Sequence, residues 1–425
     1  VCICLAYVLL CGWYFPVNEQ VATFPGKWPL IGHAYKFMCS DSKYEIPVWK
    51  RSRRVLDLCF KQHILDDYLQ LFNDRAERFV ETLADDVGQG EVDLIQKITR
   101  SVLETSWLKI DFKIIPVTTL GVNLDGKDEI NDNFAKAINC SLDTLCDRVY
   151  KPWFMFDTIF NYSNHKKILD KALETVFNFT GKVSIYIYKV NALFYPLGDK
   201  VQSVLDVILE NSVNETDSLF TDVELRNFMD TVVVGAFDTT IYQMLYVLIC
   251  IGSSSEVQDK IIQEMNEVLG KDQRLLRDNL SQLVYLDAVV KEAVRLYPVG
   301  AVIGRDVKTA TKLRNVTIPA NSSIIMHIWH INRNPKYWGP DAKEFRPERW
   351  LDSTTIPSHQ AAFATFGPGK RGCVGKSYAL MYLKATIVAL LRKYKLTADH
   401  TKMKLECKVM NKPLSGHLIQ IDKRH

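Results

Sequence analysis

The chain lacks the patterns that mark several common protein classes. Its ten cysteines include no Cys-x-x-Cys pair and no framework spacing, and its nine histidines form no His-x-x-x-His pattern. The sequence therefore indicates neither a disulfide scaffold nor a metal site built on paired ligands, and we interpret the cysteines as reduced thiols in a cytosol-facing protein. A net charge of +4 is too small to indicate nucleic acid binding. Internal repeats and low-complexity segments are also missing.

Charge is missing from the start of the chain, where no charged residue precedes Glu19. This apolar run is shorter than the roughly 20 residues that a membrane-spanning helix needs. Three interpretations remain open for it: a clipped transmembrane anchor, the apolar region of a signal peptide, or a buried helix. No small-residue cleavage site follows convincingly. The segment 24–33 holds two prolines and two glycines, which predicts a stiff, non-helical stretch.

The remaining composition is that of a globular protein, with 425 residues of which 47% are hydrophobic and 24% charged. Apolar residues three and four apart predict helices over much of the chain from Trp49 onward. The predicted helices cover 64–83, several pieces of 143–195 broken near Pro152 and Asn161, 222–250, 255–269, 283–296 and 376–393. After Pro298, short β-like runs follow at 302–304, 316–318 and 324–328, and the C-terminal stretch predicts a hairpin. We expect a mainly α fold, a helical body with a small β region.

The most informative motif is Phe366-Gly-Pro-Gly-Lys-Arg371-Gly-Cys373-Val-Gly375, which sets one cysteine on a glycine-rich turn before a helix. The positive end of a helix dipole and its free N–H groups favour a thiolate there. Glycines let such a turn bend and let a flat ligand approach closely. The alternative is a buried cysteine beside a glycine turn, which is the commoner fate of a lone cysteine.

The spacing Phe-x-x-Gly-x-Arg-x-Cys-x-Gly resembles the haem-binding loop of the cytochromes P450. The resemblance implies the P450 fold and a haem b cofactor (iron protoporphyrin IX), with Cys373 as the axial iron ligand. It also implies that Phe366, Gly367, Arg371 and Gly375 help to bind the cofactor. No covalent link is expected apart from the bond between thiolate and iron, because Gly235 stands where many relatives carry a haem-esterifying glutamate.

A second motif, Gly235-Ala-Phe-Asp238-Thr239-Thr240, lies in the middle of the predicted helix 222–250. An acid and two hydroxyls in an apolar helix are costly unless they are partnered. A helix cap or a polar stripe on a solvated face is the alternative. The resemblance implies that Asp238 and Thr239 are the catalytic acid–alcohol pair that relays protons, although Ala236 departs from the family's usual glycine.

A third constellation pairs Glu292 with Arg295, which share a helix face. Exposed pairs of this kind are common and contribute little. Arg349 follows in a Pro-Glu-Arg segment, and the resemblance implies that the three form a buried triad under the haem loop, with a role in folding and haem retention.

Several residues match positions that hold haem carboxylates in the family. They are Arg371, Arg305, and the pair Trp49 and Arg53, which lie four apart on one predicted helix. Arginine suits this task because its planar fork binds carboxylates with two hydrogen bonds. The alternative for any single arginine is a solvated surface residue.

Five basic residues are expected on the cysteine side of this fold, namely Lys50, Arg51, Arg54, Lys370 and Lys376. A basic patch there would steer an acidic redox partner toward the protein. Ordinary solubilising charge is the alternative interpretation.

Segments 60–73, 148–153 and 285–298 resemble the family-4 clan, especially its insect members. We therefore expect an N-terminal membrane anchor over 1–18, a Pro-rich hinge over 19–36 and a P450 haem domain over 37–425. Only residues 38–48 separate the hinge from the Trp49 helix, where the family places its first helices and strands. Residues 109–116 resemble extra sequence between two helices.

The leading hypothesis is a haem-thiolate monooxygenase that inserts one atom of O2 into a lipophilic substrate. The resemblance implies electrons from NADPH through NADPH–cytochrome P450 reductase, with cytochrome b5 as a further candidate donor. It also implies contact with membrane lipid and a location at the endoplasmic reticulum membrane, with the catalytic domain facing the cytosol. Two alternatives stay open: a truncated, non-catalytic chain that binds haem poorly, and a P450 isomerase or dehydratase that needs no reductase.

Overall fold

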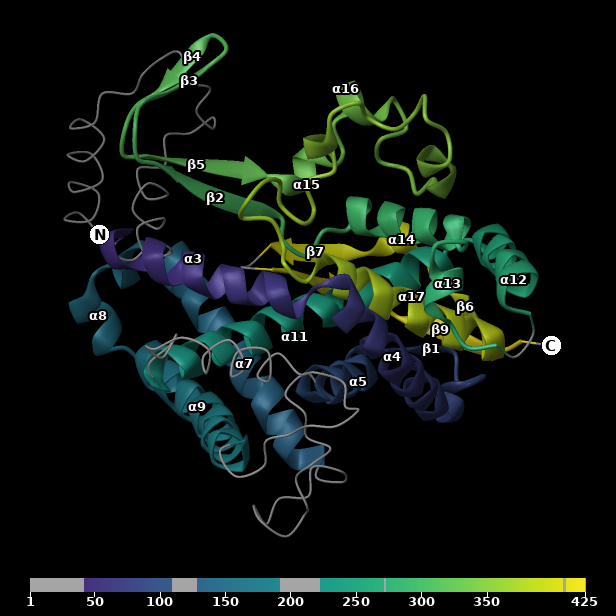
Figure 1. Ribbon diagram of the computed structural model, residues 1–425, viewed down its shortest axis with the longest axis horizontal. Helices are drawn as coiled ribbons and strands as arrows, with labels where there is room; N and C mark the ends of the chain where they lie inside the picture. Colours follow the sequence, from purple (N-terminus) through teal and green to yellow (C-terminus); the bar gives the residue numbers. More distant parts are fainter. Residues whose placement is uncertain (1–41, 109–127, 192–221, 271–272, 408–409, 425) are drawn as a thin grey trace.

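The computed structural model describes residues 42–108, 128–191, 222–270, 273–407 and 410–424. The expected anchor, the expected hinge and the segment 109–116 lie outside these residues. Most of the described chain is helical (Figure 1). The α-helices are α3 (Ser42–Cys59), α4 (Gln62–Thr82), α5 (Ile95–Leu108), α7 (Asp128–Tyr150), α8 (Asp157–Asn161), α9 (Asn164–Asn191), α11 (Asp222–Gly252), α12 (Ser255–Leu269), α13 (Arg277–Leu280), α14 (Val284–Leu296), α15 (Ile328–Ile331), α16 (Pro335–Trp338) and α17 (Lys376–Lys393).

Short 3-10 helices and four small antiparallel sheets complete the described fold. The 3-10 helices are η2 (Ala84–Asp86), η4 (Pro152–Met155), η5 (Pro347–Trp350), η6 (Gln360–Ala362) and η7 (His400–Lys402). The strands are β1 (Glu91–Val92), β2 (Val302–Val307), β3 (Thr311–Leu313), β4 (Val316–Ile318), β5 (Ser322–His327), β6 (Tyr394–Thr397), β7 (Lys404–Cys407), β8 (Asn411–Ser415) and β9 (Ile419–Lys423). Their pairings are β1–β9–β6, β2–β5, β3–β4 and β7–β8. The predicted fold class, a helical body with a small β region, is confirmed.

Helix α11 forms the centre of the core. Residues 244–251 are buried on every side of the helix, which is the pattern of a helix enclosed by protein. It contacts α5, α9, α14 and β6, and it crosses the middle of the molecule in Figure 1. Its segment Val234–Gly252 is long and apolar enough to cross a membrane, but 72% of it is buried inside the protein. This segment is therefore explained as a core helix.

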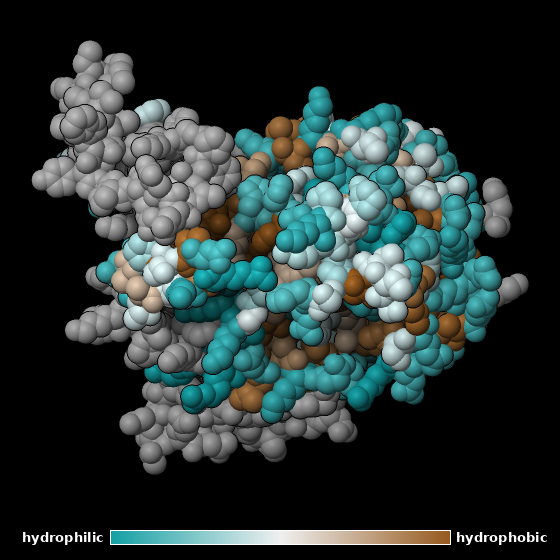
Figure 2. All heavy atoms as spheres, turned by 90° about the horizontal axis from the view of Figure 1, so that it is seen from above, coloured by the Kyte–Doolittle hydropathy of each residue, from teal (hydrophilic) through white to brown (hydrophobic). Residues whose placement is uncertain are grey.

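Aromatic packing joins α4 to α17, the helix that follows the glycine-rich loop. The rings of Phe72 and Tyr378 meet edge to face with centroids 4.7 Å apart, and the rings of Phe72 and Tyr382 are 5.5 Å apart. Such pairs add to the stabilisation that burial alone provides. Helix α17 therefore has a fixed position in the core. Polar residues cover much of the face seen in Figure 2, and apolar residues show there in separate places.

Helix α3 begins at Ser42 rather than at Trp49, so it is longer than the sequence predicts. Pro47 lies inside it, and a proline lacks the N–H that a helix interior uses. A proline at this position favours the prediction that the helix begins after it. The predicted helices 255–269 and 376–393 agree with α12 and α17 at both ends.

The turn between β8 and β9 depends on Gly416. Its φ is +71°, and a Cβ atom there would lie 2.3 Å from the backbone oxygen of Lys402. Gly90 has a φ of +83°, but no atom in the described part of the chain lies within 4 Å of the position of its Cβ. Both alanine variants carry the left-handed penalty of about 1–2 kcal/mol, and only Gly416→Ala adds a steric clash.

We expect Gly416→Ala to lower the free energy of unfolding more than Gly90→Ala does. Urea unfolding followed by far-UV circular dichroism measures both values. Equal losses in the two variants would show that the close approach to Lys402 has no energetic consequence.

Candidate active site

The candidate site begins at the loop that carries Cys373, directly before α17. The N–H of Cys373 donates to the carbonyl of Phe366 at 2.7 Å, which closes the loop. A Cβ on Gly372 would lie 2.7 Å from the oxygen of Gly367, so only glycine fits that position. The thiol of Cys373 is exposed, and a Cβ on Gly375 would lie 4.0 Å from its sulfur. The alternative of a buried structural cysteine is therefore wrong for Cys373.

Neighbouring elements hold this loop and bring cations to it. Arg53 of α3 donates through Nη1 to the oxygen of Gly372 at 2.5 Å. The side chain of Ile303 on β2 comes within 3.8 Å of the Cβ position of Gly367. Because alternate residues of a strand share a face, Arg305 lies on the same face of β2 as Ile303. The structure thus brings Arg53 to the loop that contains the exposed Arg371. It places Arg305 on the strand that contacts this loop, where its Nη1 atom donates to the carbonyl of Gly304 at 2.7 Å.

The remaining residues of this predicted set are placed as follows. Trp49 lies in α3, four residues before Arg53, and its side chain is outside the described part of the structure. The ring of Phe366 lies 5.7 Å from the Nζ atom of Lys376, at the start of α17. Lys376 and Arg54 are exposed, so positive charge lies on both the α3 side and the α17 side of the loop.

A buried carboxylate, that of Glu292, is the centre of a hydrogen-bond network next to the site. Glu292 accepts hydrogen bonds from Nη2 and Nε of Arg295, both at 2.8 Å, and from Nε of Arg349 at 2.8 Å. Trp350 Nε1 at 2.9 Å and the backbone N–H of Arg346 at 3.1 Å complete its partners. The side chains of Glu292, Arg295 and Arg349 are fully buried. A buried charge is tolerated only when it is paired and hydrogen-bonded in this way.

Asn332 connects this network to the cysteine loop. Arg295 donates to the oxygen of Asn332 at 2.6 Å, and the amide of Asn332 donates to the hydroxyl of Thr365 at 2.7 Å. The N–H of Ala364 donates back to Asn332 at 2.9 Å. Thr365 immediately precedes Phe366, so a continuous set of hydrogen bonds runs from Glu292 to the loop.

Helix α11 contributes an acid and a hydroxyl. Thr239 donates to the carbonyl of Gly235 at 2.6 Å, one turn earlier, as threonines inside helices often do. Asp238 is fully buried in mid-helix, and neither carboxylate oxygen has a hydrogen-bond partner among the described residues. The alternatives of a helix cap and of a solvated stripe are therefore wrong for Asp238. Burial raises its pKa to about 6, while the charge of Lys412 opposes that rise and the charge of Asp143 adds to it.

These residues fit a haem group. A flat, dianionic ring needs an exposed ligand, cations for its two carboxylates and an unobstructed surface on its other face. Cys373 offers the ligand, and Arg53, Arg305 and Arg371 offer the cations. Gly235 offers space on α11, because no atom of the described residues lies within 4 Å of the position of its Cβ.

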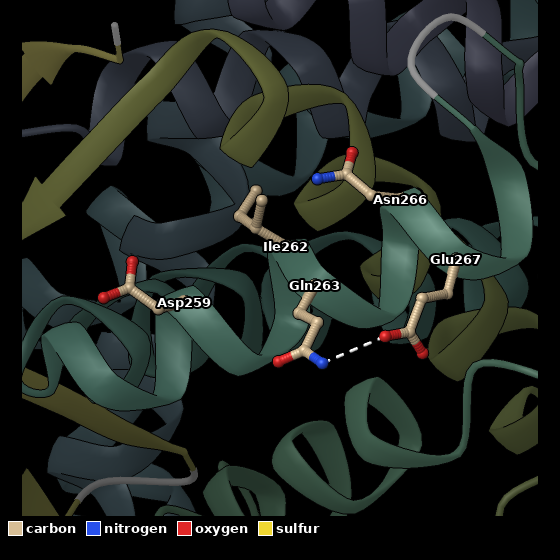
Figure 3. Close-up of a pocket in the computed structure, with 5 residues that line it drawn as sticks. All are labelled: Asp259, Ile262, Gln263, Asn266 and Glu267. Carbon is tan, nitrogen blue, oxygen red and sulfur yellow. Dashed lines mark hydrogen bonds between the residues drawn. The ribbon is translucent and has the colours of Figure 1, made fainter.

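A separate groove lies on α12 and does not belong to this site (Figure 3). Asp259, Ile262, Gln263, Asn266 and Glu267 line it, all from one helix. Gln263 donates to Glu267 at 2.9 Å. Among the described residues, the groove brings together no groups from different elements that could perform chemistry.

Sequence reasoning missed Asn332, Thr365 and Trp350. Asn332 contacts Arg295 and Thr365, which lie 37 and 33 residues away along the chain. No local pattern indicates such contacts. Trp350 follows Arg349 directly, so the Pro-Glu-Arg-Trp segment held a signal for it.

Comparison with known proteins adds independent findings. The family model described as "Cytochrome P450" matches residues 40–419. The chain is 26% identical to "Cytochrome P450 4V2" of Rattus norvegicus, over 89% of this chain and 72% of that protein. It is 27% identical to "Probable cytochrome P450 4d20" of Drosophila melanogaster, over 82% and 70%. It is 28% identical to "Probable cytochrome P450 4p2" of the same organism, over 82% and 67%.

The Glu292 network predicts unequal effects for two nearby arginines. Arg349→Met leaves Glu292 short of a buried partner and should lower the free energy of unfolding by roughly 3–5 kcal/mol. Arg346 also pairs with a carboxylate, that of Asp341 at 2.8 Å, but its side chain is 42% exposed. Arg346→Met should therefore cost less than about 1 kcal/mol. Chemical denaturation measures the free energy of unfolding of both variants. Similar losses in the two would contradict the role assigned to the burial of Arg349.

Asp238 predicts a pH-dependent stability difference. Its pKa of about 6 in the folded state exceeds the usual 3.8, so folding favours the protonated form. The contribution of Asp238 to the free energy of unfolding should fall as the pH rises from about 4 to about 6 and then stay level. Asp238→Asn removes this penalty, so its stability relative to the wild type should increase over that window, by up to about 3 kcal/mol. Urea unfolding at pH 4 and pH 7 measures it, and a pH-independent difference would exclude a raised pKa.

Proposed function

The chain belongs to the cytochrome P450 family, and on that premise we propose that it is a haem-thiolate monooxygenase in which Cys373 binds the iron. Membership supports a P450 monooxygenase with a haem cofactor in general. The assignment of residues rests on one observation above all. The exposed thiol of Cys373 lies three residues before α17, on a loop held by Arg53 and by the hydrogen bonds that lead to Glu292.

The proposed roles follow from what each side chain can do. When bound, haem supplies an iron at which dioxygen is cleaved, a reaction that a thiolate ligand favours. Arg53, Arg305 and Arg371 hold the carboxylates of the ring through charge-assisted hydrogen bonds. Asp238 holds or releases a proton near neutral pH, because its pKa is about 6. The hydroxyl oxygen of Thr239 keeps lone pairs free to accept, since its hydrogen points to Gly235.

The triad has a supporting role in this proposal. Glu292, Arg295 and Arg349 do not contact substrate; they keep the segment before Phe366 in place through Asn332 and Thr365. We assign them to folding and to haem retention.

We propose NADPH–cytochrome P450 reductase as the electron donor, with cytochrome b5 as a further candidate. Exposed Arg54, Lys370 and Lys376 support this, because the contact between Arg53 and Gly372 places α3 beside the cysteine loop. A cationic surface at the loop raises the rate of encounter with an acidic partner. The substrate is proposed to be lipophilic. We further propose a P450 haem domain from residue 37, attached to the endoplasmic reticulum membrane and facing the cytosol.

The spectrum of the reduced, CO-bound protein tests this proposal. The purified protein should show the red-shifted Soret band of a thiolate ligand, and Cys373→Ser should lose that band and retain less haem. Cys407→Ser is the matched control, because Cys407 is also exposed but lies on β7. An unchanged band and haem content in Cys373→Ser would refute the proposal.

A further inference from the structure

Strand β8 and helix α7 meet on one face of α11, next to Asp238. Lys412 at the start of β8 donates through Nζ to Asn139 at 2.9 Å and lies 3.4 Å from Asp143, and both of these residues belong to α7. The same Nζ atom is 5.6 Å from the ring centre of Tyr242. Tyr242 follows Asp238 by one helical turn, so the two side chains share a face of α11. Lys412 therefore lies on the side of α11 that carries Asp238.

The start of β8 is fixed in this position. Asn411 donates from its backbone N–H to the oxygen of Val299 at 2.8 Å and from its amide to the oxygen of Pro298 at 2.9 Å. Tyr246, one further turn along α11, donates to the oxygen of Asn411 at 2.7 Å. Lys412 follows directly, and its side chain is only 14% exposed. Its ammonium group is held in place by both α7 and α11.

Asp238 is an unusual neighbour for this cation. Its side chain is fully buried, yet neither oxygen has a hydrogen-bond partner among the described residues. Among the described residues, Lys412 and Asp143 are the charged side chains that act on it, and Tyr242 and Tyr246 are further titratable groups on the same face. A direct salt bridge would keep Asp238 ionised, and burial alone would keep it protonated. In the observed arrangement Asp238 has neither a direct salt bridge to a described residue nor an environment free of charge.

We propose that Lys412 and Asp143 are positioning residues for proton delivery. Their opposite charges act on Asp238 and keep its carboxyl group able both to take up and to release a proton. This inference rests on the proposed monooxygenase function, because only a reaction that consumes protons at α11 makes use of it. The positive charge of Lys412 favours release of the proton from Asp238, and the negative charge of Asp143 favours its uptake. Neither residue contacts the reacting atoms.

Two substitutions separate this role from a merely structural one. Lys412→Met and Asp143→Asn both break the same ion pair, so a structural role predicts similar effects. The proposed role predicts opposite effects on the pKa of Asp238, because one variant removes a positive charge and the other a negative charge. Lys412→Met should raise that pKa and Asp143→Asn should lower it, each by roughly one pH unit, or about tenfold in proton affinity.

Infrared difference titration of the full-length, haem-loaded protein measures the carboxyl group, with Asp238→Asn identifying its band. Lys412→Arg keeps the positive charge and should restore the wild-type titration. Lys402→Met is a surface control, because that lysine is 75% exposed and pairs with Asp399 alone among the described residues. Shifts in the same direction for Lys412→Met and Asp143→Asn, or no shift in either, would overturn the inference.

A second measurement separates this inference from the proposed function. The fraction of NADPH electrons that reaches product should follow the same displaced pH profiles in the two variants, while the CO-bound spectrum stays that of the wild type. A wild-type protein without the thiolate band would refute the proposed function, yet the carboxyl titration would still report on Lys412 and Asp143. Opposite carboxyl shifts with unchanged pH profiles of coupling would overturn the role in proton delivery.

Discussion

The buried charge of Glu292 is the constraint on which the rest of the site depends. A carboxylate without access to water is strongly unfavourable unless donors surround it. Five donors from Arg295, Arg346, Arg349 and Trp350 meet this need. They come from α14 and from the segment around η5, so the charge joins parts of the chain that lie more than fifty residues apart. The same network reaches the cysteine loop through Asn332. The hydrogen bonds that satisfy this buried acid thus help to hold the loop that carries Cys373, together with Arg53.

Asp238 is also a buried acid, but its surroundings differ from those of Glu292. The fold gives Glu292 every partner it can accept, but it leaves both oxygens of Asp238 without one among the described residues. The first arrangement fixes a charge and makes a rigid support. The second leaves a group that responds to pH near neutrality, which is the property that a proton donor or acceptor needs. The two acids lie on helices that pack against each other, α14 and α11.

Sequence reasoning succeeded where the determining interactions are local. Helix α12 starts where predicted because Ser254 caps it, accepting a hydrogen bond from the N–H of Val257. The glycine-rich loop and the pair Glu292 and Arg295 are also encoded in short spacings. It failed where contacts are distant or a local rule is overridden. Asn332 and Lys412 act through residues 33 to 273 positions away, and no pattern in one sequence indicates such partners. The start of α3 at Ser42 was not predicted, because Pro47 lies inside that helix.

The central claim is that the loop supported by Glu292 presents the sulfur of Cys373 to a haem iron. Iron K-edge X-ray absorption of the purified, haem-loaded protein tests it most directly, because sulfur and nitrogen scatter differently in the first coordination shell. The account predicts four nitrogen ligands and one sulfur ligand, with the sulfur signal lost in Cys373→Ala. A first shell of nitrogen and oxygen alone in the wild-type protein, or a sulfur signal that persists in Cys373→Ala, would contradict it.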